Sequence, residues 1–184
     1  MTTSEMLKPR SKENYEAINR NSDLPSIMAS ILRQELDSMI RVIYLLNIKD
    51  LIERERLMSE LMNGKTWIVS TKKGKSRKLR DKDMVDLSNE FHGWTRLVYK
   101  FGCAFIHLSN FHNYSNKNPF DLLPENEQKE LLDHLRYYHG GPFSDHPSFE
   151  DLSSFFPRVF EKITDHLKCY IDHLKFKDTN CLDR

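Results

Sequence analysis

Apolar residues recur at alternating steps of three and four along residues 82–114, which is the spacing of one α-helix face. This apolar stripe comprises Met84, Leu87, Phe91, Trp94, Val98, Phe101, Phe105, Leu108 and His112. A second stripe lies nearly opposite and is polar yet almost uncharged: His92, Arg96, Tyr99, Cys103, His107, Asn110 and Tyr114. Exposed helix faces normally carry charges, so we expect both faces to be covered. The pattern therefore predicts one long central helix over 82–114.

Helical periodicity also predicts helices over 12–21, 24–49, 50–62, 124–139 and 158–175, with Pro25 in a first turn. The strand-like segment 66–71, followed by a Gly-containing loop, predicts a β-hairpin over about 66–80. Because two strands are marginally stable alone, we expect Trp67 to dock the hairpin onto the helices. The fold class is thus all-α: five to seven helices around a long central helix, with one hairpin inserted before it. We expect a disordered tail over 1–11, a single domain over 12–176 and a loose tail over 177–184.

The charge, the cysteines and the glycine motifs of the chain argue against several classes of function. A chain of 184 residues with a net charge of +1 has no bulk charge that favours nucleic acid. Its three scattered cysteines form neither a disulfide framework nor a metal motif, and no apolar run reaches the length of a membrane span. Dinucleotide and phosphate-binding glycine motifs are absent from the sequence. We therefore expect a cytoplasmic protein with no cofactor and no membrane partner.

The densest polar cluster of the predicted central helix contains His107, Asn110 and His112. Two histidines five residues apart point about 140° apart on a helix, so they do not face one metal ion. Histidine is the usual acid–base side chain of proteins, so His107 is a candidate acid or base. The alternative is that these groups are hydrogen-bonded polar residues buried between helices.

The tripeptide Asp-His-Leu occurs three times, with its histidines at His134, His166 and His173. The last two copies are seven residues apart and share one helix face, so their histidines and carboxylates are candidate metal ligands. The alternative places leucine in the core and Asp and His on a solvated face.

Residues 72–82 contain seven Lys or Arg and one Asp. Such clusters contact phosphates in nucleic-acid binding, and the candidate contacts are Lys72, Lys73, Lys75, Arg77 and Lys78. Lysines also protect hairpin edges from pairing, and no aromatic residue interleaves these basic positions for base stacking. A solvated hairpin tip is therefore the alternative.

A helical protein whose central helix ends in the hexad His107–His112 resembles the HEPN superfamily of small helical bundles, many of which are dimeric ribonucleases. Their hallmark is an arginine followed, four to six residues later, by a histidine near the dimer axis. His112 matches the histidine, and His107 stands where the family has arginine. The resemblance implies a homodimer that binds or cleaves RNA through His107, Asn110 and His112. A non-enzymatic scaffold and a metal-binding bundle are the alternatives.

Overall fold

The computed structural model describes residues 3–70 and 74–175. Its α-helices are α1 (Thr3–Arg20), α2 (Pro25–Asn47), α3 (Leu51–Met62), α4 (Asp81–His92), α5 (Thr95–Ile106), α6 (Glu125–His139), α7 (Phe149–Ser153) and α8 (Phe156–Lys175). The short 3-10 helices are η1 (Asn110–Asn113) and η2 (Pro119–Leu122), and strands β1 (Ile68–Ser70) and β2 (Ser76–Lys78) form an antiparallel hairpin. The predicted all-α bundle with one inserted hairpin is confirmed. No helix of the described ranges is long and apolar enough to cross a membrane.

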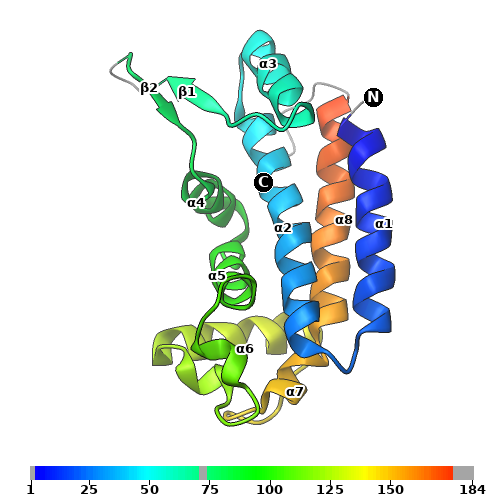
Figure 1. Ribbon diagram of the computed structural model, residues 1–184, viewed down its shortest axis with the longest axis vertical. Coiled ribbons are helices and arrows are strands. Elements are labelled where there is room, and N and C mark those ends of the chain that lie inside the picture. The colour runs from blue at the N-terminus through cyan, green and yellow to red at the C-terminus, as the bar shows by residue number, and fades with distance from the viewer. Residues whose placement is uncertain (1–2, 71–73, 176–184) are drawn as a thin grey trace.

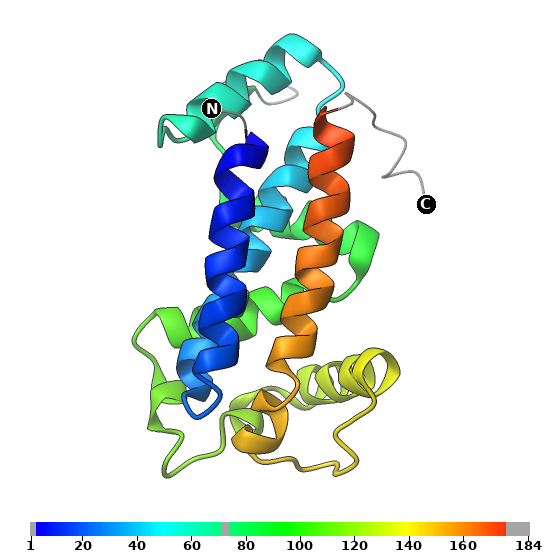
Figure 2. The ribbon, with the colours of Figure 1, turned by 90° about the vertical axis from the view of Figure 1, so that its right-hand side faces the viewer.

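Helix α2 is the central helix of the bundle. It packs most extensively against α8 and α5 and also contacts α1, α4, α7 and α3. Helices α1 and α8 run alongside it, whereas α4 and α5 cross it on another side (Figures 1 and 2). Seven of its side chains are 0% exposed: Leu36, Met39, Ile40, Val42, Ile43, Leu45 and Leu46. A helix that is apolar around so much of its circumference belongs in a core.

The prediction of one helix over 82–114 is wrong. Helix α4 ends at His92 because Gly93 adopts a left-handed conformation with φ +71°, which a residue with a side chain rarely adopts. Helix α5 ends at Ile106, and His107 is already extended. Ser109 then caps η1 by accepting a hydrogen bond from the Phe111 amide. The apolar spacing of the sequence continues across both breaks because α4, α5 and η1 all present apolar residues to the same core.

Helices α5 and α2 approach each other closely at Gly102. A Cβ added there would lie 2.6 Å from the Cβ of Arg33, so only glycine fits this crossing. Arg33 covers part of the predicted polar stripe: its guanidinium carbon is 3.6 Å from the Tyr99 ring centroid and its Nε donates to Sγ of Cys103 at 3.2 Å. The expectation that this face is covered is therefore met at Tyr99 and Cys103.

The hairpin docks through Trp67, as predicted. This side chain is 4% exposed, stacks on Tyr44 at 5.8 Å and donates from Nε1 to the Leu57 carbonyl oxygen at 2.8 Å. The predicted disordered tail over 1–11 is wrong from Thr3 onward, because α1 begins there and buries Leu7 to 4% exposure. The predicted tail over 177–184 lies outside the described residues.

A buried carboxylate joins the three parallel-lying helices α1, α2 and α8. Glu35 of α2 is 1% exposed. It accepts hydrogen bonds from Ser11 and Asn14 of α1 and from Thr164 of α8, the last two at 3.0 and 3.3 Å. Buried charge is tolerated only when it is hydrogen-bonded, and here neutral donors from both neighbouring helices provide those bonds.

Candidate functional site

The residues that the sequence predicted as catalytic lie at the surface. His107, Asn110 and His112 are all exposed, and they follow α5 rather than forming a buried stripe. Nε2 of His112 lies 3.1 Å from the backbone oxygen of His107, and its ring packs edge-on against Phe105. Two side chains next to them are unusual for a surface, since Leu108 is 97% exposed and Ile106 is 47% exposed.

The basic hairpin is only partly described. Lys72 and Lys73 lie outside the described residues, whereas Lys75, Arg77 and Lys78 are exposed. Nη1 of Arg77 bonds to Oδ2 of Asp83 at 2.6 Å, so one of the predicted phosphate contacts is engaged within the chain. That hydrogen bond lowers the pKa of Asp83 to about 2. The same carboxylate caps α4 by accepting from the Arg80 amide.

The structure brings together four histidines that the sequence analysis did not group. We define the histidine–aromatic cluster as His92, Trp94, His134, Tyr138, His139, Lys162, His166 and Tyr170. The rings of His92 and His166 stack with centroids 4.7 Å apart, and those of His134 and His139 meet edge-on at 5.6 Å. Trp94 lies between these pairs, 6.2 Å from His166 and 5.6 Å from His134. The interpretation of His134 as solvated is wrong, because it is 8% exposed.

Three local features of the sequence build this cluster. The left-handed Gly93 separates α4 from α5 and places His92 and Trp94 on either side of the break. On α8, Lys162, His166 and Tyr170 are four residues apart and therefore share a face. His134 and Tyr138 have the same spacing on α6. The i, i+4 spacings on α6 and α8 can be read from the sequence. The break at Gly93 is what adds His92 and Trp94 to the residues of these two helices.

Lys162 is the cation at the centre of the cluster. Its Nζ lies 3.1 Å from the Tyr138 ring centroid and 5.1 Å from that of Trp94, so two aromatic faces hold it by cation–π attraction. No carboxylate of the described residues forms an ion pair with it. The nearby acidic residues Asp133, Glu161 and Asp165 are exposed. Asp165 is paired instead with Lys168 at 3.3 Å.

Several polar atoms of the cluster are buried without a hydrogen bond. They are Nζ of Lys162, Nε2 of His134, Nε2 of His139 and Nδ1 of His166, for which the described residues provide no partner. Nε2 of His92 differs, because the Tyr170 hydroxyl lies 2.8 Å from it. More than nine in ten buried polar groups in proteins have a partner, so a lysine and three neighbouring histidines that are exceptions mark a place that needs a physical explanation.

Burial dominates the electrostatics of the cluster. It lowers the pKa of His92 to about 4, with repulsion from His166 and Lys162 adding to the effect. Burial, followed by repulsion from Lys162, lowers the pKa of His134 to about 3 and of His139 to about 4. The pKa of Lys162 falls to about 8 because its ammonium is desolvated. At neutral pH the imidazoles are therefore uncharged and Lys162 carries the positive charge.

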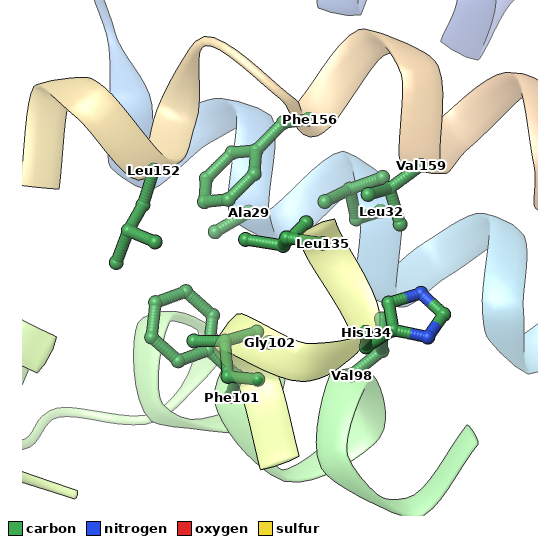
Figure 3. Close-up of a pocket in the computed structure, with 11 residues that line it drawn as sticks. Ala29, Leu32, Val98, Phe101, Gly102, His134, Leu135, Leu152, Phe156 and Val159 are labelled. Carbon is green, nitrogen blue, oxygen red and sulfur yellow. The ribbon is translucent and has the colours of Figure 1, made fainter. Parts of the chain in front are cut away.

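The cluster borders a small cavity through His134. The cavity has a volume of about 30 Å³ and lies between α2, α5, α6, α7 and α8. Its lining is apolar apart from His134, whose ring lies on the opposite side from Phe101 and Leu152 (Figure 3). A space of this size holds at most about one water molecule, and apolar walls offer that water no partners.

A metal centre is not formed by the described side chains. No group of three or more His, Cys, Asp or Glu residues in the described ranges is arranged to hold a metal ion. Two histidines of the Asp-His-Leu tripeptides, His134 and His166, do lie close to the Trp94 ring. The seven-residue spacing between His166 and His173, on which the predicted metal site depended, does not bring about these contacts.

No protein-family model matches the chain, and no curated protein or solved structure is similar to it. Its function is therefore inferred from its own residues.

Proposed function

We propose that the protein binds an anionic small molecule at the histidine–aromatic cluster, with Lys162 as the anion-binding cation. The observation that carries this proposal is that Nζ of Lys162 and three ring nitrogens of the histidines around it are buried without a hydrogen-bond partner among the described residues. An oxyanion has several acceptor oxygens. It can accept from the ammonium and from imidazole N–H groups of His134, His139 and His166, whose tautomers adjust to the ligand. The cluster lacks a carboxylate that would repel such a ligand.

Exposed aromatic rings at the C-terminal end of α6 and in the segment that follows it indicate the other part of the ligand. Tyr137 is 82% exposed, Tyr138 is 53% exposed and Phe143 is 96% exposed. Phe143 lies in a segment that Arg136 holds in place, because its guanidinium donates to the carbonyl oxygens of Pro142, Phe143 and Ser144 and to Asp145. Exposed aromatic side chains can stack on a planar ring of a ligand. The proposed ligand class is therefore a phosphate or carboxylate attached to a planar ring.

Access to the buried nitrogens runs past Tyr138 and Lys162. Tyr138 is half-exposed and Lys162 has the long, unbranched side chain of the cluster. Moving the ammonium off the Tyr138 ring exchanges a cation–π contact for an ion pair, which is the stronger interaction in a desolvated site. The ligand thus replaces an internal contact of Lys162 instead of filling an open pocket.

The proposal predicts specific loss of anion binding when the ammonium is removed. Adenosine 5′-monophosphate serves as the probe. Its two parts, adenosine and inorganic phosphate, are titrated separately for comparison. Lys162→Met keeps an unbranched side chain without the charge and should weaken binding of the monophosphate by about tenfold or more, since a charge-assisted contact is lost. Calorimetric titration measures the affinity.

Lys129→Met, at an exposed lysine of α6, is the matched control and should bind as the unchanged protein does. Equal binding by adenosine and its monophosphate would contradict the proposed role of Lys162. So would an affinity that Lys162→Met leaves unaltered.

A second proposal follows from the exposed residues that flank the sequence-predicted site. We propose that Ile106 and Leu108, beside His107 and His112, form the centre of a homodimer interface that brings two copies of His107, Asn110 and His112 together on RNA. Leu108 at 97% exposure and the absence of charged residues from Phe101 to Asn116 support this idea. An uncharged apolar face is self-complementary across a two-fold axis. HEPN-like proteins are arranged in this way.

Sedimentation at micromolar concentration tests the dimer. The unchanged protein should sediment as a dimer, and Leu108→Asp should be monomeric because two carboxylates would meet at the axis. Tyr137→Asp, an exposed aromatic residue on α6, is the control and should leave the dimer intact. A monomeric unchanged protein rules out the shared site. A dimer whose RNA cleavage or binding is unaffected by His107→Ala and His112→Ala rules out the role of the histidines.

A further inference from the structure

We infer that the groove between α1 and α8 binds a single-chain amphiphile with an anionic head group, such as a long-chain carboxylate. The groove has a volume of about 520 Å³, within the range of roughly 300–1,000 Å³ that is usual for small-molecule sites. Helices α1 and α8 lie side by side along it, with α2 behind them (Figure 2). This site is independent of the histidine–aromatic cluster, because its lining shares no residue with that cluster.

Both helices contribute to the apolar floor of the groove. Leu7 of α1 and Leu167 and Ile171 of α8 form it, with Tyr15 at one end. Tyr15 is 46% exposed and its ring lies 6.3 Å from that of Phe160, so it closes this end against the core. An apolar floor between two helices that lie side by side fits a linear chain better than a compact ligand.

The polar groups in the middle of the groove are already engaged. Ser11 and Thr164, which line it from opposite helices, both donate to the buried carboxylate of Glu35. They therefore have no hydroxyl hydrogen left for a ligand. A ligand segment lying across them must not require hydrogen bonds, as is true of a hydrocarbon chain.

The charges at the groove are predominantly positive. Lys8, Lys12 and Lys168 line it together with one acidic residue, Asp172. Asp172 is itself paired with Lys175, and Lys168 with Asp165, both at 3.3 Å, so Lys8 and Lys12 carry the excess positive charge of the rim. The rim therefore complements an anionic head group and disfavours a cationic one. A single head group with one chain matches this arrangement of a basic rim above an apolar floor.

The decisive experiment titrates dodecanoate, below its micellar concentration, into the full-length protein and follows binding by calorimetry. Dodecanoate should bind, and affinity should fall roughly three- to fourfold for each CH₂ removed, because each one buries less apolar surface. Dodecyltrimethylammonium, with the same chain and the opposite charge, should bind at least tenfold more weakly.

Variants then locate the site. The triple substitution Lys8→Gln, Lys12→Gln and Lys168→Gln should weaken dodecanoate binding at least tenfold. The charge-matched control, Lys49→Gln, Lys117→Gln and Lys129→Gln, changes exposed lysines elsewhere and should leave it unaltered. No binding of dodecanoate, or equal binding of the cationic amphiphile, overturns the inference. Binding that is lost in Lys162→Met but kept in the groove variant also overturns it, because the ligand would then belong to the histidine–aromatic cluster.

Discussion

Lowering the pH from 7 to 4.5 is expected to reduce the free energy of unfolding by several kcal/mol. The cause is the histidine–aromatic cluster, in which burial holds the pKa of His92, His134 and His139 at about 4, 3 and 4. An unfolded histidine has a pKa of about 6.5. Between these values the unfolded chain binds more protons than the folded protein, so acid favours unfolding.

The pH window follows from the direction in which folding changes these pKa values. When folding lowers the pKa of a histidine, the free energy of unfolding has its full value above about pH 6.5, where the histidine is neutral in both states. It then falls progressively as the pH approaches the pKa of the folded state. A tenfold difference in proton affinity between the folded and unfolded states corresponds to about 1.4 kcal/mol. Half-burial of His92 and the coupling among the histidines reduce their combined effect to on the order of 3–6 kcal/mol. Loss of the Asp83 ion pair contributes at lower pH, because the pKa of that carboxyl is about 2.

Urea unfolding at half-unit pH steps between 8 and 4.5 measures the effect. The combined variant His134→Gln and His139→Gln should flatten the pH dependence, even if it lowers stability at pH 8. The control His107→Gln and His146→Gln changes two exposed histidines and should keep the full dependence. A free energy of unfolding that is constant from pH 7 to 5 would show that the four imidazoles are not buried together.

Glu35→Ala is expected to destabilise the protein by about 2–4 kcal/mol, even though it removes a buried charge. The substitution leaves Ser11, Asn14 and Thr164 without their shared acceptor, and each buried donor left unpartnered is costly. It also removes the polar link that fixes α1 and α8 on α2. Glu35→Gln retains an oxygen acceptor and should lose less than half as much.

Chemical unfolding at pH 7 gives these differences directly. Glu16→Ala is the control. Glu16 forms an exposed ion pair with Arg20, so this substitution should cost less than about 1 kcal/mol. If Glu35→Ala costs no more than Glu16→Ala, the carboxylate is not the junction of the three helices.

The sequence predicted most helices well because their apolar faces follow one period and clear end signals bound them. Pro25, predicted in a first turn, stands at the start of α2 in the structure. The breaks at Gly93 and His107 escaped prediction, because apolar spacing continued through both. A single glycine inside a helical pattern is usually tolerated, and its left-handed conformation here depends on tertiary packing.

The choice of central helix and of candidate site failed for a related reason. Residues 82–114 carry the longest periodic stripe, but α2 makes the most extensive contacts, which depend on how helices from both halves of the chain assemble. Part of the polar stripe is uncharged because Arg33 of α2 covers it. Arg33 donates a hydrogen bond to Cys103 of that stripe, 70 positions further along the chain. The four clustered histidines come from α4, α6 and α8, and no local pattern predicts that three separate segments converge.

Calorimetric titration of adenosine 5′-monophosphate at pH 8, in buffers of different ionisation enthalpy, tests the anion-binding proposal most directly. At this pH the ligand phosphate is fully ionised, whereas Lys162, with a pKa of about 8, is half-protonated. Binding of an anion raises that pKa, so the protein should take up roughly 0.3–0.5 proton, and Lys162→Met should take up none. Binding without proton uptake, or uptake that persists in Lys162→Met, would contradict the proposal that Lys162 in the histidine–aromatic cluster holds the anion.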